Sequence, residues 1–263
     1  MDTLEAIILG IVQGLTEFLP VSSSGHLVLT QELLGVNERG LTFEIMVHVG
    51  TLLSVLVYFR SKVFRLCKAP FTPSDKEGRR WILYLIIGTI PLFFVVPFKG
   101  DLEKVYQMPD ITALLLIVTG GLLLLPKLLS GRADQDLKGK SAFFMGIGQA
   151  FAVLPGISRS GSTITAGLLC KVKPAVAAEF AFLLSIPAIL GSLVLDLYQN
   201  WSDLDTSSFA LYGLAAAAAF LSGLLAVYTV LATIRSGKFA YFAYYCFIAG
   251  ITGFIYFRWV APA

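Results

Sequence analysis

The sequence has few charged residues: of its 263 residues only 14% are Asp, Glu, Lys or Arg, whereas 56% are hydrophobic. Soluble domains have about 25% charged residues, so the composition excludes an ordinary soluble protein. Alternation of polar and apolar residues at period two is also absent, which favours membrane-spanning helices over a barrel. The sequence therefore predicts an all-α polytopic membrane protein that forms a single membrane domain, 1–263.

Basic residues and cysteines are also scarce. The net charge of +3 comes without a dense basic stripe, so a nucleic-acid partner is not expected. The three cysteines have no CxxC spacing, which excludes a metal cluster or a disulfide framework and predicts thiols used for packing. The first apolar segment carries Asp2 and Glu5 and has no small-residue cleavage site, so we expect mature protein rather than a signal peptide.

Eight apolar segments are present, and two of them are interrupted. The uninterrupted segments are long enough to cross a hydrocarbon core about 30 Å thick, and they are 41–59, 81–98, 111–128, 175–196, 209–234 and 239–258. The loop that follows the first of them is rich in Lys and Arg, which places it in the cytoplasm by the positive-inside rule. The interrupted segments, 1–30 and 141–170, agree with the remaining basic residues only if each enters the membrane and returns to the same side.

This topology places both termini in the periplasm. Of the 20 Lys and Arg residues, those left on the periplasmic side are Arg39, Lys99, Lys104 and Arg258. Arg159 falls on neither side, because it lies within the second interrupted segment. An intramembrane arginine is costly, about 3 kcal/mol on insertion scales, so it requires a partner or a function.

Each half of the chain, 1–130 and 141–263, thus consists of one re-entrant helical hairpin and three transmembrane helices, with opposite orientations. Such an inverted-topology repeat is supported by sequence, since Gly10-Ile11-Val12-Gln13 matches Gly146-Ile147-Gly148-Gln149 and a glycine follows twelve residues after each glutamine. Two hairpins that enter from opposite faces meet near the midplane. Serines immediately precede a predicted helical run in each turn, 27–34 and 163–169, and the N-termini of such helices bind anions, above all phosphate.

Several polar residues near these turns have alternative roles. Arg159 either forms an ion pair with Glu17 or Glu179, or holds phosphate oxygens with its planar guanidinium. Glu17 is either a structural partner of Arg159 or, with Gln13 one helical turn earlier, a group that holds a divalent cation or orients a water. A lone histidine is most often structural, but His26 beside a serine and a carboxylate favours an acid or base.

His48 lies in the middle of a predicted span. It either lines the same cavity or bonds a neighbouring helix.

Two motifs resemble a known family. Gln13-x-x-x-Glu17 with Pro20-Val21-Ser22-Ser23-Ser24-Gly25-His26, and Pro155-Gly156-Ile157-Ser158-Arg159-Ser160-Gly161-Ser162-Thr163, are similar to the signatures (E/Q)xxxE and PGxSRSxxT of the bacterial undecaprenyl-diphosphate phosphatases, the bacitracin-resistance family. Both signatures are matched in full and in the same order, and the resemblance covers essentially the whole chain.

The resemblance implies an inner-membrane enzyme that removes the terminal phosphate of undecaprenyl diphosphate, opens to the periplasm and uses Mg²⁺ or Ca²⁺. It implies that the functional residues are Gln13, Glu17, Ser22, Ser23, His26 and Arg159. The other motif positions are expected to bind phosphate, and these are Ser24, Gly25, Gly156, Ser158, Ser160 and Thr163. Gln13 would supply only a neutral oxygen to the cation, because it takes the glutamine option of the first signature.

The expected mechanism has Ser23 attack the terminal phosphorus while His26 manages its proton. Attack by a water that Glu17 or His26 activates, with Ser23 only positioning the phosphate, is the alternative. A lipid-phosphate transporter or flippase could use the same midplane anion site without hydrolysis, because inverted repeats with broken helices are also typical of carriers. We also expect that the chain forms a homodimer, since its glycines favour helix packing.

Overall fold

The computed structural model describes all residues except 37–40, 99–103, 130, 132, 200–207 and 261–263. The described residues are helical nearly throughout and contain no strand, apart from an isolated bridge between Gln135 and Val172. The predicted all-α class is therefore confirmed for these residues. The segments around Arg39 and Lys99 that the charge count places outside lie beyond the described residues.

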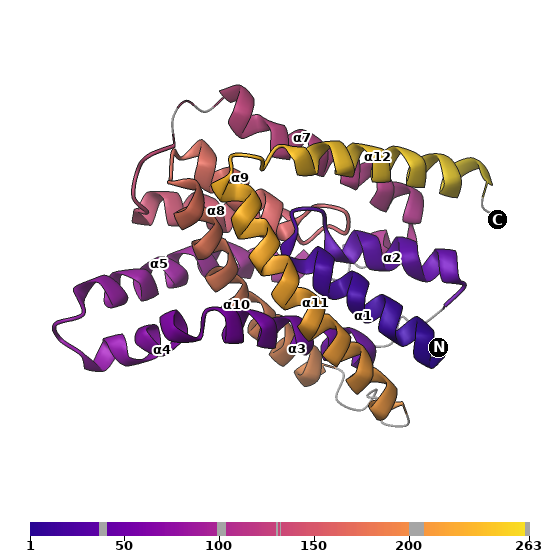
Figure 1. Ribbon diagram of the computed structural model, residues 1–263, viewed down its shortest axis with the longest axis horizontal. Coiled ribbons are helices and arrows are strands. Elements are labelled where there is room, and N and C mark those ends of the chain that lie inside the picture. Colours follow the sequence, from indigo (N-terminus) through magenta and orange to yellow (C-terminus); the bar gives the residue numbers. More distant parts are fainter. Residues whose placement is uncertain (37–40, 99–103, 130, 132, 200–207, 261–263) are drawn as a thin grey trace.

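The first half of the chain contains a helical hairpin followed by longer helices, shown in indigo to magenta in Figure 1. Its helices are α1 (Thr3–Phe18), α2 (Ser23–Leu34), α3 (Leu41–Tyr58), α4 (Arg60–Lys68), α5 (Lys76–Phe93) and α7 (Pro109–Leu129). Short 3-10 turns lie at η1 (Ala69–Phe71), η2 (Val96–Phe98) and η3 (Lys104–Gln107).

The second half also begins with a helical hairpin that longer helices follow. Its helices are α8 (Gly139–Phe151), α9 (Arg159–Leu169), α10 (Pro174–Gln199), α11 (Phe209–Arg235) and α12 (Tyr241–Ile255), and a π-helical turn, η5 (Tyr256–Val260), follows. Figure 1 shows the start of α1 and the end of α12 at one end of the molecule, opposite the turn between α4 and α5.

In the part of the chain that the structure describes, three helices, α7, α10 and α11, are long and apolar enough to cross a membrane by length and composition. Residues Thr42–Tyr58 and Arg60–Phe71 would make a fourth span, but the chain bends by 81° between them. The helices at the other two predicted spans, 81–98 and 239–258, do not meet this criterion of length and composition among the described residues. Helix α5 carries several charged residues in its first turns, and α12 is regular for only 15 residues.

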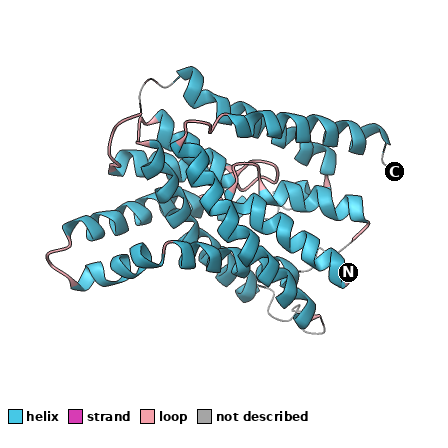
Figure 2. Cartoon of the chain, in the orientation of Figure 1, coloured by secondary structure: helices cyan, strands magenta, loops and turns pink. Residues whose placement is uncertain are grey.

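Both interrupted segments fold as helical hairpins, α1–α2 and α8–α9, and Figure 2 draws their turns near the middle of the helical body. Helix α1 ends at Phe18, where Leu19 is extended, because a residue before proline disfavours the helical region. Helices α2 and α9 begin at Ser23 and Arg159, about one turn earlier than the sequence predicts.

The first helix of each hairpin packs closely on a long helix of the other half. Helix α1 approaches α11 at Gly10, where an added Cβ would lie 2.3 Å from the Ala215 carbonyl oxygen. Helix α8 approaches α5 at the matching Gly146, where it would lie 2.2 Å from the Gly88 carbonyl oxygen. The two matching glycines therefore allow equivalent backbone contacts that fix the depth of each hairpin.

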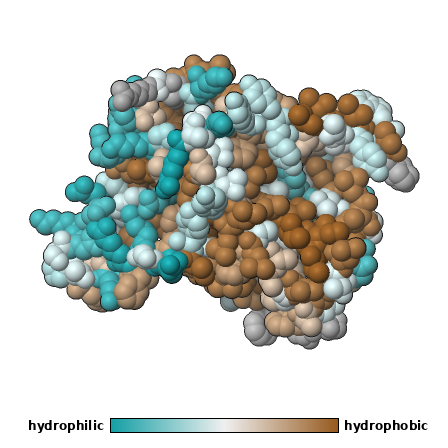
Figure 3. Space-filling view, in the orientation of Figure 1, coloured by the Kyte–Doolittle hydropathy of each residue, from teal (hydrophilic) through white to brown (hydrophobic). Residues whose placement is uncertain are grey.

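The turn between α4 and α5 is polar and forms its own network. Asp75 caps α5 by accepting from the Gly78 backbone N–H at 2.9 Å, and Arg65 donates to both Asp75 carboxylate oxygens at 2.9 and 2.7 Å. The Arg65 hydrogen bonds, and then that from Gly78, lower the pKa of Asp75 to about 2. Figure 3 shows hydrophilic residues at this end of the visible face and hydrophobic residues across its middle.

Candidate active site

A cavity of about 750 Å³ lies where the two hairpin turns meet α3, α5 and α10. Its polar part contains Glu17, Ser23, Arg159 and His48. The rest of the wall is largely apolar, with side chains from the end of α5 and the middle of α10, such as Leu92, Phe93, Ile189 and Leu193. The cavity thus offers a polar end and an apolar wall, as an amphipathic ligand requires.

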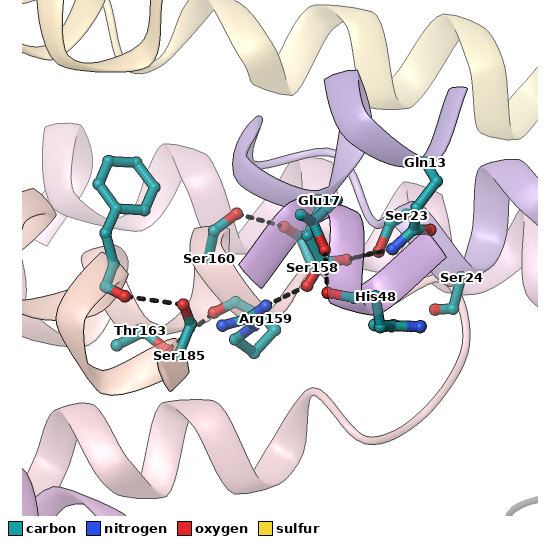
Figure 4. A network of polar contacts seen from close by, with 12 residues as sticks. Gln13, Glu17, Ser23, Ser24, His48, Ser158, Arg159, Ser160, Thr163 and Ser185 are labelled. Atoms are coloured by element: carbon teal, nitrogen blue, oxygen red, sulfur yellow. Dashed lines mark hydrogen bonds and ion pairs between the residues drawn. The ribbon is translucent and has the colours of Figure 1, made fainter. Parts of the chain in front are cut away.

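Glu17, near the end of α1, is the centre of the polar network (Figure 4). Its Oε1 atom is paired with Nη2 of Arg159, and its Oε2 atom accepts from Ser23 Oγ at 2.5 Å and from Gln13 Nε2 at 3.0 Å. The Glu17 side chain is only 5% exposed, so a buried carboxylate is balanced by a cation and two neutral donors. The predicted ion pair between Arg159 and Glu17 is thus present, whereas Glu179 pairs with Lys62 at 3.2 Å.

Arg159 also faces the cavity. Its side chain is 18% exposed and lines the cavity, although Nη2 is held by Glu17. An ion pair on one side therefore leaves the guanidinium placed to meet an anion in the cavity, and the structural and functional interpretations of Arg159 are compatible.

Gln13 is not among the residues that line the cavity, and it carries a buried amide oxygen without a partner among the described residues, as does Gln149 at the matching position of α8. Gln13 is 0% exposed, and its Oε1 atom has no hydrogen-bond partner in the described part of the protein, while Nε2 donates to Glu17. No group of three or more His, Cys, Asp or Glu side chains in the described residues could hold a metal. A cation here would have one carboxylate and one amide oxygen from the protein, ligand types that Mg²⁺ and Ca²⁺ accept when phosphate oxygens and waters complete the shell.

The two turns have the same capping chemistry. Ser22 accepts from the Gly25 N–H at 3.4 Å and lies 3.3 Å from Ser24 Oγ. Ser158 accepts from the Gly161 N–H at 3.1 Å and lies 3.3 Å from Ser160 Oγ. Each serine thus satisfies a free backbone donor at the start of its helix, as an N-cap does.

The turns also contact each other directly. The Gly156 N–H donates to Ser22 Oγ at 3.1 Å, and a Cβ on Gly25 would lie 3.1 Å from the Gly156 Cα. Gly156 has φ +95°, which a side chain would strain. Ser22 has φ 69° without being glycine, a conformation that costs about 1–3 kcal/mol and persists because its surroundings hold it.

The contact brings two helix N-termini to the polar end of the cavity. Ser23 and Ser24 begin α2, Arg159 begins α9, and all three line the cavity. The positive ends of both helix dipoles and the arginine therefore make this end suited to an anion of high charge.

Thr119 of α7 supports the second turn, a role that sequence reasoning missed. Its hydroxyl donates to the Gly156 carbonyl at 2.7 Å and accepts from the Ser158 N–H at 3.0 Å. Its signal in the sequence is a hydroxyl in the middle of an apolar span, where a buried polar group requires a partner.

The remaining motif residues divide between the cavity wall and the packing behind it. Ser22, Ser24 and Ser158 line the cavity. Ser160 instead donates to the Leu19 carbonyl at 3.0 Å, and Thr163, which is fully buried, donates to the Arg159 carbonyl at 2.8 Å. Ser160 and Thr163, like Gly25 and Gly156, thus shape the turns rather than line the cavity.

His48 of α3 lines the cavity, and its Nδ1 atom bonds the Glu44 carbonyl at 2.8 Å. Figure 4 draws it together with the network around Glu17 and Ser23. The expectation that His48 could line the cavity thus matches its position.

His26 is not among the residues that line the cavity. Its Nδ1 atom bonds the Ser22 carbonyl at 2.8 Å and its Nε2 atom bonds the Tyr245 hydroxyl at 2.8 Å. Both ring nitrogens are therefore engaged away from Ser23, whose hydroxyl faces Glu17. The expectation that His26 takes the Ser23 proton does not fit this geometry.

Comparison with known proteins identifies relatives over nearly the whole chain. The profile of the family described as Bacitracin resistance protein BacA matches residues 6–252. A protein named undecaprenyl-diphosphatase from Methanobrevibacter smithii is 43% identical over 253 residues, covering 89% of this chain and 90% of the relative. Another of that name from Carboxydothermus hydrogenoformans is 41% identical over 269 residues, covering 99% and 95%.

Proposed function

The chain belongs to the bacitracin resistance protein BacA family, and we propose that its cavity is the active site of a membrane-embedded undecaprenyl-diphosphate phosphatase. The enzyme hydrolyses undecaprenyl diphosphate to undecaprenyl phosphate and inorganic phosphate, and so recycles the lipid carrier for peptidoglycan synthesis. The observation that carries this proposal is the contact of one buried carboxylate, Glu17, with both a hydroxyl nucleophile and an intramembrane arginine.

The diphosphate binds at the polar end of the cavity. Arg159 and the N-termini of α2 and α9 neutralise its charge, and this electrostatic stabilisation is the main requirement of phosphoryl transfer. The apolar wall formed by α5 and α10 receives the first part of the isoprenoid tail, and the remainder lies in the bilayer.

Ser23 is the nucleophile and Glu17 is its base. The Ser23 oxygen forms a bond to the terminal phosphorus while its proton passes to Oε2 of Glu17, 2.5 Å away. The bond between that phosphorus and the bridging oxygen breaks, and undecaprenyl phosphate leaves. A water then attacks the phosphoserine, which restores Ser23 and releases inorganic phosphate.

Gln13 and Glu17 are the residues that would hold the divalent cation, Mg²⁺ or Ca²⁺. The buried and unpartnered Oε1 atom of Gln13 supports this assignment, because an amide oxygen without a partner is costly to bury. The cation, when bound, neutralises negative charge on the diphosphate oxygens.

The protein is organised as an inverted repeat, and its active site opens to the periplasm. The matched close approaches of Gly10 and Gly146 and the matched caps of α2 and α9 support the repeat. The cavity reaches Gln107, three residues after Lys104, which the charge pattern places outside, and the start of α1 and the end of α12 lie at the end opposite the basic α4–α5 turn. Both features support a periplasmic opening and periplasmic termini.

We expect purified protein with undecaprenyl diphosphate and Mg²⁺ or Ca²⁺ to release inorganic phosphate, and a chelator to lower the rate by at least tenfold because the diphosphate charge is then poorly neutralised. Colorimetric phosphate measurement with and without added cation tests this. Transport of labelled lipid across vesicles without phosphate release would instead support a lipid-phosphate transporter.

The replacement Gln13→Leu is expected to raise the Mg²⁺ concentration for half-maximal phosphate release by about tenfold, because one cation ligand is lost. Gln149→Leu is the matched control, since Gln149 occupies the corresponding position of α8 and is 1% exposed with an unpartnered amide oxygen, whereas it is the amide of Gln13 that bonds Glu17. An unchanged Mg²⁺ dependence in the Gln13 variant would contradict the assignment of this ligand.

A further inference from the structure

Tyr245, on α12, reaches the α2 turn from the other half of the chain. Its hydroxyl lies 2.8 Å from Nε2 of His26, and the two rings stack with centroids 5.6 Å apart and planes 12° from parallel. A tyrosine of α12 therefore contacts the histidine that lies two residues after the Ser22-Ser23-Ser24 run.

The contacts of His26 fix the position of its protons. Nδ1 lies 2.8 Å from the Ser22 carbonyl oxygen, which can only accept, so Nδ1 carries a proton and donates it. In the neutral ring Nε2 is then an acceptor, and the Tyr245 hydroxyl donates to it. The tyrosine thus holds both the tautomer and the orientation of the imidazole.

The Ser22 carbonyl is the point where this chain of bonds meets the active site. It accepts from the backbone N–H of His26 at 3.1 Å as well as from the ring. Ser22 is held at φ 69°, and its hydroxyl joins the turns of both halves through Gly156. The peptide that carries this carbonyl also carries the N–H of Ser23, so its orientation determines where the Ser23 hydroxyl points.

We propose that Tyr245 is a positioning residue for the phosphatase: acting through the His26 imidazole, it holds the Ser22–Ser23 peptide so that Ser23 faces Glu17. The proposal rests on the proposed function and assigns His26 a positioning role in place of proton transfer. Small misplacements of a reacting group are costly, and loss of a second group that orients the first commonly lowers activity by about 10–100-fold.

The test is phosphate release from undecaprenyl diphosphate by the full chain and its Tyr245→Phe variant, which keeps the stacked ring and removes the hydroxyl. We expect kcat to fall by about tenfold while KM changes by less than twofold, because substrate contacts are retained. Tyr244→Phe is the matched control, an adjacent and similarly exposed tyrosine on α12, and should match the wild type.

A double-mutant cycle with His26→Ala tests whether Tyr245 acts through His26. Tyr245→Phe should have no further effect in that background, and an equal loss in both backgrounds would overturn the proposal. His26→Asn, which keeps a donor near the Nδ1 position without a titrating proton, should recover part of the activity lost in His26→Ala. Equal activity of the Asn and Ala variants would overturn the positioning role.

A readout independent of activity follows from the histidine content, which is only two residues. In protein labelled with ¹⁵N-histidine, Tyr245→Phe should shift the Nε2 resonance of His26 and leave that of His48 unchanged. If wild-type protein releases no phosphate, the proposed function fails. If the wild type is active and Tyr245→Phe matches it with unchanged resonances, only the present inference fails.

Discussion

Replacing Arg159 with lysine is expected to lower kcat/KM for undecaprenyl diphosphate by about 100-fold while the protein stays folded. Lysine retains a positive charge beside Glu17, which is only 5% exposed, so the buried carboxylate keeps a partner. A point charge cannot hold Glu17 on one side and phosphate oxygens on another as a planar guanidinium can. Steady-state phosphate release measures the loss, and thermal unfolding in detergent checks the fold.

Arg159→Ala should lower both activity and stability further than Arg159→Lys, because it removes the phosphate ligand and leaves Glu17 buried without a cation. We expect a loss of about 1,000-fold in kcat/KM together with a lower melting temperature. Arg65→Lys is the matched control: Arg65 also binds a carboxylate, Asp75, through two nitrogens, but it lies at the α4–α5 turn. Wild-type turnover by the Arg159→Lys variant would refute the assignment of Arg159 to the phosphate.

The contact between the α1–α2 and α8–α9 turns could be predicted from the sequence, because it follows from the polar residues that both turns carry within apolar segments. Residues such as Arg159 and Glu17 are too costly to expose to lipid, and the positions of the other basic residues leave a re-entrant path as the simplest solution. The pairing of Glu17 with Arg159 was among the alternatives for the same reason. The sequence predicts starts for α2 and α9 that are about one turn too late, because a capping serine and a serine within a turn look alike in a sequence.

The contact of His26 with Tyr245 could not be predicted, because the two residues lie 219 positions apart in the chain. Proximity in sequence to Ser23 suggested an acid or base, whereas the first turn of α2 directs the ring toward α12. Tyr245 lies in a run with several aromatic residues, and nothing in that run distinguishes it from Tyr244. The contact between Tyr245 and His26 therefore follows only from the packing of α12 against the first half of the chain.

The matching of the two halves explains how one site acquires two different functional groups. Ser23 and Arg159 each lie ten residues after the matching glutamines, and each is the first residue of its helix. By the same count Glu17 corresponds to Val153, so the carboxylate has no counterpart in the second half. Equivalent positions thus supply the serine proposed as nucleophile from one hairpin and the arginine proposed to bind the anion from the other, and Glu17 contacts both.

This arrangement predicts that Ser23→Ala abolishes the covalent route and lowers kcat by at least 10,000-fold, since loss of a nucleophile removes the step itself. Glu17→Gln should lower kcat by about 1,000-fold or more, because the amide cannot accept the Ser23 proton. Rapid-quench mass spectrometry of the wild type should detect a phosphate on the peptide that contains Ser23. Ser222→Ala is the control, a hydroxyl on α11 that bonds the Ala218 carbonyl at 2.7 Å and does not line the cavity.

The two possible nucleophiles make opposite predictions for the same variant. If a water attacks directly and Ser23 only positions phosphate, Ser23→Ala keeps appreciable turnover and no phosphoserine accumulates at any quench time. The 2.5 Å contact between Ser23 Oγ and Glu17 Oε2 favours the covalent route, because the hydroxyl directs its proton toward a carboxylate that can accept it. Retained turnover with no trapped phosphoserine would leave Glu17 as the base for water and Ser23 as a phosphate ligand.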